Sequence, residues 1–328
     1  MVELVQNQQN LIVLDNSVDK YINQLREKQK LILILDIDHT IVDQDSSNTN
    51  NSNHSIKIRP LTKDFLEKVS QYYDILPETS HGKDFLNAAM QVVDSEHKYF
   101  NFQNHIVKDF LTIKIHADEN SYDYDRKISM LQIKPFYWKD DDKNDDTLTK
   151  ISNIIVDDIH HNFFKSNYDD VFVYVFDFKR KVFKDCYILL DGLWKADEYD
   201  KKKKLISKAE AFGATITLRF VPYVTHIVTE NPSKELIEEA MTYDEIFIVD
   251  VKWLLNSCLN FERDDEDDYQ VDDYPVKTYG SKPRSLPPIQ RDINSTDFDE
   301  LMKYNSSSDS EFSDSDESSS VSSYSDEN

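Results

Sequence analysis

The chain has 328 residues, enough for two ordinary domains that each bury their own core. Its 62 acidic and 38 basic side chains give a formal net charge of −24, which repels nucleic acid and anionic membranes in general. The two cysteines, Cys186 and Cys258, have no metal-binding spacing and argue against a disulfide framework. The densest apolar run, 31–35, is too short to span a bilayer, and no secretory signal is present, so we expect a soluble intracellular protein.

The first strongly patterned segment is LILILDIDHT at 31–40, which follows a polar, helical lead-in over residues 1–27. Five consecutive aliphatic residues that end in acid are typical of a strand buried on both faces of a sheet covered by helices. The polar run 43–55 predicts a loop. Apolar residues at helical spacing then predict helices over 65–73 and 84–93.

The middle of the chain is charged and irregular between about 115 and 150, and apolar runs return as NIIVDD at 153–158 and VFVYVFDF at 171–178. NIIVDD again places aliphatic residues before paired carboxylates, so we predict a second buried strand there. Pro77 cannot donate a sheet hydrogen bond, which predicts that its strand is short or ends at Leu76.

From residue 181 the pattern restarts in shorter units. Strand-like runs alternate with helical patterns, the strands at 187–192, 214–218, 225–229 and 246–249 and the helices at 200–213, 233–241 and 251–259. This alternation predicts a small parallel α/β domain over 181–270. Beyond it, prolines mark a linker, and residues 305–328 are almost entirely Ser, Asp and Glu, which predicts disorder because little apolar surface is available for burial.

The sharpest chemical signal is the pair Asp36 and Asp38 at the carboxyl end of the first strand, where open α/β sheets place their sites. A carboxylate nucleophile is repelled by a phosphate dianion, and Mg²⁺ held by Asp36 and further oxygen ligands removes much of that repulsion. Asp38 points to the same side of the extended chain, so it can protonate the leaving alkoxide and later activate water. A solvated Asp-x-Asp turn is the alternative, and the preceding aliphatic run disfavours it.

Several stretches resemble a known family. LILILDIDHTIV resembles the first motif of the haloacid-dehalogenase superfamily, in the form used by the RNA polymerase II C-terminal-domain phosphatases. The segment 57–75 is similar to that family's Leu-Arg-Pro-Gly segment, with Arg59 and Pro60 matching, and NIIVDD matches the paired aspartates of its last motif. The resemblance implies a haloacid-dehalogenase-like parallel sheet with flanking helices over residues 28–180.

The resemblance also implies roles for single residues. Asp36 is the nucleophile, and Asp38 is the acid and base. Thr79 and Arg59 bind the phosphate. Asp158 is the third Mg²⁺ ligand beside Asp36 and Asp38, and Asp157 is its supporting carboxylate. The catalytic lysine of the third motif is Lys139 by its spacing to Asp157, with Lys134 and Lys143 as alternatives. The surroundings of Thr79 depart from the family pattern, since Pro77-Glu78 precede it and Ser80-His81-Gly82 follow it.

Residues 181–270 resemble a BRCT domain, whose motifs stand in the expected order: VFKDCYILLDGL, Gly213, THIVT and Trp253. Trp253 is expected in the core. Phosphopeptide-binding members of that family place Ser or Thr before the glycine of the first strand, where this chain has Asp191 before Gly192, although Lys234 matches their helix lysine. A carboxylate repels a phosphate, so docking or positioning of the phosphatase domain is the favoured role.

A phosphatase domain, a BRCT domain and an acidic tail over 271–328 together resemble the TFIIF-associated type of polymerase phosphatase. The resemblance implies a nuclear enzyme that dephosphorylates serines in the C-terminal repeat of the largest RNA polymerase II subunit through an aspartyl-phosphate intermediate. It also implies that the tail binds the large TFIIF subunit through 295–304, where Phe298, Leu301 and Met302 lie at helical spacing. Stray apolar residues in a disordered tail are the alternative for that segment.

Two other functions stay open. A catalytically weak or inactive phosphatase fold that recruits transcription partners through its BRCT domain and tail is suggested by the unusual residues around Thr79 and by the unsettled lysine. A nucleic-acid end-phosphatase is disfavoured by the net charge of −24 and by the absence of a basic aromatic surface, so we expect no direct nucleic-acid contact.

Overall fold

The structure is a computed structural model that describes residues 20–44, 56–102, 111–117, 129–137, 139, 144–193, 199–271 and 273–287. Residues 20–27 are helical, as predicted for the lead-in. The acidic tail over 305–328, the segment 295–304 and the loop over 45–55 lie outside the described residues. The chain divides into two compact units at Arg284, and both sheets described below belong to the first unit. Within the described part of the chain, no helix has both the length and the apolar character needed to cross a membrane.

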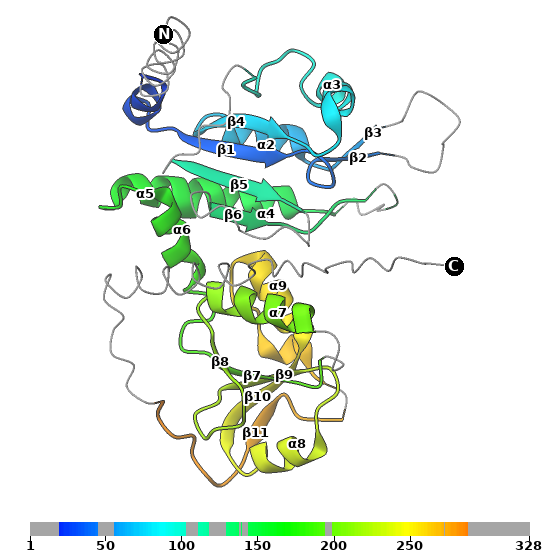
Figure 1. Cartoon of the computed structure of the whole chain (residues 1–328), viewed down its shortest axis with the longest axis vertical. Coiled ribbons are helices and arrows are strands. Elements are labelled where there is room, and N and C mark those ends of the chain that lie inside the picture. Colours follow the sequence, from blue (N-terminus) through cyan, green and yellow to red (C-terminus); the bar gives the residue numbers. More distant parts are fainter. Residues whose placement is uncertain are drawn as a thin grey trace, which may run out of the picture. The chain divides into compact units, whose positions relative to one another are not determined.

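The first sheet has four parallel strands in the order β4-β1-β5-β6 (Figure 1), formed by Tyr73–Glu78, Leu31–Asp36, Thr112–His116 and Ser129–Gln132. β1 lies inside the sheet, and its five aliphatic residues are all buried. Burial on both faces is the reason why this strand needs an unbroken apolar run. β6 falls inside the region that we expected to be irregular, and β5 lies at its edge; the sequence pattern missed both strands. A short antiparallel pair, β2 (Val42–Gln44) and β3 (Ile56–Ile58), flanks the undescribed loop.

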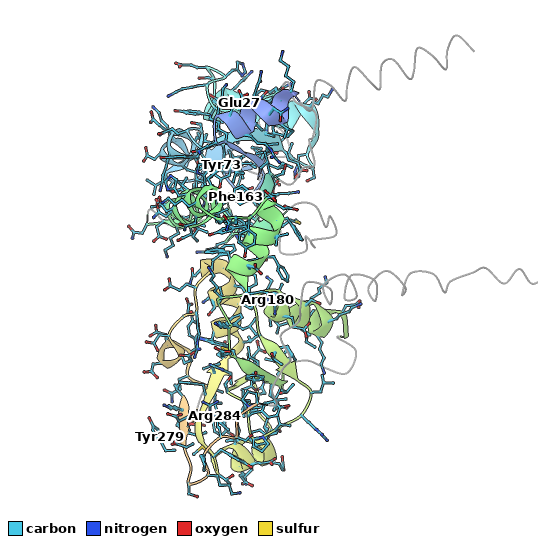
Figure 2. All side chains as sticks on the ribbon, turned by 90° about the vertical axis from the view of Figure 1, so that its left-hand side faces the viewer. Glu27, Tyr73, Phe163, Arg180, Tyr279 and Arg284 are labelled. Atoms are coloured by element: carbon cyan, nitrogen blue, oxygen red, sulfur yellow. The ribbon has the colours of Figure 1, made fainter. Side chains whose placement is uncertain are left out.

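Helices cover this sheet. They are α2 (Thr62–Val69), α3 (Gly82–Val93), α4 (Thr147–Asn153), the π-helix η1 (Ile154–His160), α5 (His161–Lys165) and α6 (Val171–Lys179). Figure 1 shows α4, α5 and α6 alongside β5 and β6, and Tyr73 and Phe163 lie among the interior side chains in Figure 2. α3 confirms the predicted helix over 84–93. The helix predicted over 65–73 ends early at Val69, because Tyr73 already belongs to β4.

The strand predicted over 153–158 is wrong, because these residues continue α4 as the π-helix η1. The buried apolar residues of α4 and η1 recur three or four positions apart and form one helical face: Leu148, Ile151, Ile155, Val156 and Ile159. Six residues are too few to separate a buried strand from a buried helix, whereas the longer window has helical periodicity. The run 171–178 likewise forms α6, with Val171 and Val175 buried one turn apart.

β4 continues through Pro77 to Glu78, so the expected stop at Leu76 is wrong as well. β4 lies at the edge of its sheet, where one side of the strand needs no hydrogen-bonding partner, and an edge strand therefore tolerates proline. Pro77 lies opposite Leu35, which brings Glu78 level with Asp36. The extra length of β4 thus carries its carboxyl end to the predicted nucleophile.

The second sheet has the order β11-β10-β9-β7-β8, formed by Lys277–Tyr279, Asp244–Asp250, His226–Thr229, Tyr187–Asp191 and Thr215–Thr217. Its strands are parallel except for β11, which the sequence pattern missed. Figure 1 shows α7 (Tyr199–Ala211) and α9 (Val251–Asn260) on one face and α8 (Lys234–Ala240) on the other. This is the small α/β domain that the resemblance to BRCT domains predicts. Trp253 is fully buried, which confirms its expected place in the core.

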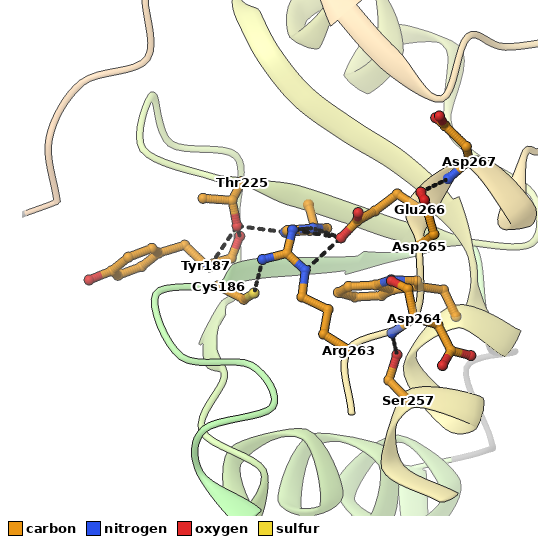
Figure 3. A network of polar contacts seen from close by, with 11 residues as sticks. Cys186, Tyr187, Thr225, Ser257, Arg263, Asp264, Asp265, Glu266 and Asp267 are labelled. Carbon is orange, nitrogen blue, oxygen red and sulfur yellow. Dashed lines mark hydrogen bonds and ion pairs between the residues drawn. The ribbon is translucent and has the colours of Figure 1, made fainter. Parts of the chain in front are cut away.

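A buried polar network joins this sheet to the segment after α9 (Figure 3). His226 stacks on Trp253 with ring centroids 4.5 Å apart, and its Nε2 lies 3.2 Å from Glu266 Oε1. Arg263 pairs with Glu266 at 2.6 Å and donates to Cys186 Sγ at 3.5 Å. Burial lowers the pKa of His226 to about 4. For Glu266, burial raises the pKa, but hydrogen bonds from His226 and Arg263 outweigh it and lower the pKa to about 2.

Candidate active site

The predicted nucleophile, Asp36, ends β1 in a half-buried position. Burial is the largest influence on its carboxyl. Together with the charges of Glu78 and Asp38 it outweighs the lowering effects of Thr40 and Lys114, so the pKa is raised to about 6. The Thr40 hydroxyl donates to Asp36 Oδ2 at 3.2 Å. With a pKa of about 6, Asp36 is mostly ionised at neutral pH, as a nucleophile must be.

Asp38 lies in the tight loop that follows β1. His39 has a left-handed φ of 54°, and its backbone N–H donates to the Val42 carbonyl at 2.8 Å, so the loop turns back immediately. The Asp38 side chain is only 13% exposed, and its Oδ2 lies 3.1 Å from His81 Nδ1 and 3.5 Å from His39 Nε2. Two histidines from different elements therefore surround the predicted acid.

Thr79 joins these carboxylates from the neighbouring strand. The backbone N–H of Ile37 donates to the Glu78 carbonyl at 3.0 Å, which continues the pairing of β1 with β4 beyond Asp36. Thr79 follows directly, and its hydroxyl accepts a hydrogen bond from the His81 backbone at 3.1 Å. The structure thus brings Asp36, Asp38 and Thr79 to the carboxyl edge of two adjacent parallel strands, where such sites are expected.

Lys114 is a cation of this site that the sequence analysis missed. It lies on β5 opposite Ile34, and its ammonium group pairs with the Glu78 carboxylate of β4 across β1. Its charge also lowers the pKa of Asp36. The only sequence signal is a lysine inside the alternating segment TIKIH, which lies at the edge of the region that we expected to be irregular.

Comparison with known proteins finds a phosphatase family that matches this part of the chain. Residues 31–171 match the model of the NLI interacting factor-like phosphatases. The match begins at the first residue of β1 and extends to the start of α6, so it contains Asp36, Asp38, Thr79 and Lys114.

Relatives of this chain include phosphatases of the C-terminal domain of RNA polymerase II. The one from Caenorhabditis elegans is 21% identical over 335 residues, which cover 83% of this chain and 49% of the relative. The one from Saccharomyces cerevisiae is 30% identical over 94 residues, 28% of this chain and 13% of the relative. The chain therefore spans about half the length of the first relative and less of the second.

The solved structure of Fcp1, described as an essential RNA polymerase II CTD phosphatase, matches 77% of this chain and 99% of its own with a TM-score of 0.63. A fission yeast Fcp1 structure with beryllium fluoride bound gives a TM-score of 0.64 over the same shares. Both are 17% identical to this chain, so they establish the fold, and the predicted α/β class is confirmed.

Arg59 has a different place in the phosphatase domain from the one that the resemblance implied. Its side chain is fully buried and pairs with Asp145 through Nε at 2.8 Å and Nη2 at 3.3 Å. Its Nη1 donates to the carbonyls of Thr40 and Lys134 at 3.1 and 2.9 Å. These bonds occupy most of the guanidinium, so in this structure Arg59 ties the loop after β1 to the segment before α4 and does not offer its donors to a phosphate.

Asp157 and Asp158 lie on η1, away from Asp36. The same π-helix is held at the amino ends of the strands, because Tyr73 Oη donates to the Ile155 carbonyl at 2.6 Å and His160 Nε2 lies 2.6 Å from the Gln29 carbonyl. Tyr73 begins β4 and Gln29 precedes β1, whereas Asp36 ends β1. The structure therefore does not bring Asp158 to the other two predicted Mg²⁺ ligands.

The candidate lysines of the third motif are Lys139, Lys134 and Lys143. Lys139 and Lys134 are both exposed, and Lys143 lies outside the described residues. The backbone N–H of Phe136 donates to the His39 carbonyl at 2.7 Å, so the segment that leads to Lys139 begins beside the loop after β1. Lys139 keeps its place as a candidate, now together with Lys114.

The carboxylates at the end of β1 fit a hard divalent cation in part. Asp36 and Asp38 lie there with Glu78 from the end of β4, and Lys114 is the cation that acts on Asp36. Burial is the largest cause of the raised pKa of Asp36, and the charges of Glu78 and Asp38 contribute to it. Carboxylate oxygens are the donors that Mg²⁺ prefers. A further carboxylate, Asp43, lies with Asp38 and His39 in a group whose candidate ligand atoms are all within 4.8 Å of one another.

In the second sheet, Asp191 occupies the place that the BRCT resemblance marks for a phosphate contact. Its Oδ2 accepts hydrogen bonds from the backbone N–H and the hydroxyl of Ser233, at 2.8 and 3.2 Å. Lys234 pairs with Glu238 at 3.5 Å. An internal carboxylate therefore already uses the donors at the start of α8.

Proposed function

We propose that this chain is a Mg²⁺-dependent protein serine/threonine phosphatase with Asp36 as its nucleophile. The observation that carries the proposal is the meeting of Asp36, Asp38 and Thr79 at the carboxyl edge of β1 and β4, inside a segment that matches the model of a phosphatase family. We place the phosphatase domain at 28–180 and the BRCT domain at 181–270.

The reaction follows from the positions of these groups. Ionised Asp36 attacks the phosphorus atom, and the bond from phosphorus to the serine oxygen breaks as an aspartyl-phosphate forms. Asp38 gives its proton to the departing serine oxygen, then takes one from the water that splits the aspartyl-phosphate and releases phosphate. Thr79 and a lysine, Lys114 or Lys139, bind the phosphate oxygens. Asp36 through its carboxylate, and Asp38 through its backbone carbonyl because its carboxyl carries the proton, would hold Mg²⁺, which would neutralise phosphate charge.

The proposed substrate is the phosphorylated C-terminal repeat of RNA polymerase II, which would place the enzyme in the nucleus. The support is that relatives in two organisms are named as phosphatases of this polymerase domain. The large TFIIF subunit is the proposed partner of residues 295–304, on the resemblance of the domain order alone.

A catalytically weak scaffold is the second candidate, and one observation favours it. Asp158, the third predicted Mg²⁺ ligand, lies on η1 near the amino ends of the strands rather than beside Asp36. A site with fewer carboxylate ligands holds Mg²⁺ less firmly, and such a fold would serve to recruit partners instead of hydrolysing phosphate.

Hydrolysis of p-nitrophenyl phosphate and of a polymerase-repeat phosphopeptide, with and without Mg²⁺, tests both candidates. We expect Mg²⁺-dependent turnover that Asp36→Asn abolishes, while Asp64→Asn, an exposed carboxylate on α2, leaves it unchanged. No turnover by the folded wild type would favour the scaffold. Asp158→Asn gives a further reading: a loss as complete as that of Asp36→Asn would show that Asp158 does act at the site.

A further inference from the structure

His81 lies where three parts of the site meet. Its ring Nδ1 is 3.1 Å from Asp38 Oδ2, and its backbone N–H donates to the Thr79 hydroxyl at 3.1 Å. It also stands immediately before α3, which begins at Gly82. One residue therefore touches both the predicted acid of the loop after β1 and the predicted phosphate-binding threonine after β4.

The ring of His81 also contacts an aromatic ring of α3. Phe85, one helical turn further along α3, lies with its ring centroid 5.2 Å away at an interplanar angle of 48°. Phe85 itself is partly buried and packs against the core, so its ring is held in place beside His81. The hydroxyl of Ser80 is the other polar group near Nδ1, at 3.5 Å, and the carboxylate is closer and charged.

His39, the second histidine near Asp38, is committed elsewhere. Its Nε2 is 3.5 Å from Asp38, while its Nδ1 lies 3.3 Å from both Asp43 and the Phe136 carbonyl. His39 thus organises its own loop. His81 is the contact that links Asp38 to the strand that carries Thr79.

We propose that His81 is a positioning residue for Asp38. The approach of its Nδ1 to Oδ2 at 3.1 Å orients the Asp38 carboxyl and leaves the other carboxyl oxygen to hold the proton that passes to the leaving oxygen. The inference rests on the proposed phosphatase function, and it assigns to His81 a role that depends on the leaving group. A weakly basic leaving group departs without a proton, so a misplaced Asp38 affects it little.

Two aryl phosphates of similar shape separate this role from a general loss of structure. p-Nitrophenyl phosphate has a weakly basic leaving group, and phenyl phosphate has a strongly basic one that needs the acid. A well-placed general acid contributes about 10²–10⁴-fold, so we expect His81→Ala to lower kcat for phenyl phosphate and for a phosphoserine peptide by about 10–100-fold. For p-nitrophenyl phosphate the expected loss is under about threefold, because no proton transfer is required.

The conservative variant is His81→Asn, because the amide nitrogen of asparagine reaches the position of Nδ1 but not that of Nε2. It should restore most of kcat for phenyl phosphate. His97→Asn is the matched control, since His97 also packs against an aromatic ring, that of Phe102 at 6.1 Å, and its left-handed φ of 52° suits asparagine.

Equal losses of kcat on both aryl phosphates, or a His81→Asn variant no better than His81→Ala, would overturn the positioning role while the wild-type activity still supports the proposed function. A wild type without turnover on either aryl phosphate would overturn the proposed function, and the inference with it.

Discussion

Replacing Arg59 by methionine is the sharpest test of how the site loop is held. Methionine keeps an apolar stem of similar length but removes every donor. The variant leaves the Asp145 carboxylate, which is 10% exposed, without its guanidinium partner, and it strips a hydrogen bond from the carbonyls of Thr40 and Lys134. Thr40 is the residue whose hydroxyl donates to Asp36, so the damage reaches the nucleophile.

The expected cost follows from the burial of the pair. Removing one partner of a buried ion pair costs about 3–5 kcal/mol, because the remaining charge stays buried without its partner. The pKa of Asp145 reflects the same balance: burial raises it, but hydrogen bonds from Arg59 and Thr147 outweigh burial and lower it. A carboxyl whose folded pKa is depressed stabilises the fold above its unfolded pKa, and that contribution is lost as the pH falls through the folded value. Arg59→Met should remove this pH-dependent contribution of Asp145 to the free energy of unfolding.

The free energy of unfolding in urea at pH 7 measures the effect. Arg180→Met, at an exposed arginine, should stay within about 0.5 kcal/mol of the wild type. The double variant Arg59→Met/Asp145→Leu should recover part of the loss, because the orphaned charge is gone. A loss of less than about 1 kcal/mol, together with weaker inhibition by inorganic phosphate, would refute this reasoning and return Arg59 to the phosphate-binding role that the resemblance implied.

Two more predictions concern the second sheet and the turns. His226 has a pKa lowered to about 4 from 6.5, so its contribution to stability is present above pH 6.5 and is lost as the pH falls through about 4; Glu266 extends the loss toward pH 2. His226→Phe should flatten the first step in a pH series of urea unfolding, and an unchanged slope would contradict this account. Gly192→Ala should lower thermal stability far more than Gly82→Ala: both glycines have positive φ, but a Cβ at 192 would lie 1.8 Å from the Asn231 carbonyl oxygen, whereas at 82 it meets nothing within 4 Å. Gly82→Ala should cost only the left-handed strain, about 1–2 kcal/mol, and equal melting losses would argue against the clash.

The sequence alone was enough to predict β1 and the carboxylates after it. Five aliphatic residues in a row have one low-energy environment, the interior of a sheet covered on both faces, and the chain must leave that sheet where the acids begin. The second sheet was predictable for a related reason. Its strands and helices from β7 to α9 are short, alternate except at β8 and β9, and carry their own periodicity, so local pattern and final fold agree there, although β11 was missed.

Only the tertiary structure decided which residues share the site. Lys114 lies beside Asp36 because β5 pairs with β1, and no local pattern encodes that long-range pairing. Asp158 was expected there and lies elsewhere, since the helical face over 148–159 outweighs the six-residue run that resembles a strand. Arg59 forms a buried ion pair instead of binding phosphate, because Asp145, far away in sequence, supplies a buried carboxylate. Short-range periodicity determines which elements form, whereas the contacts between elements, formed against loop-closure entropy, determine which side chains meet.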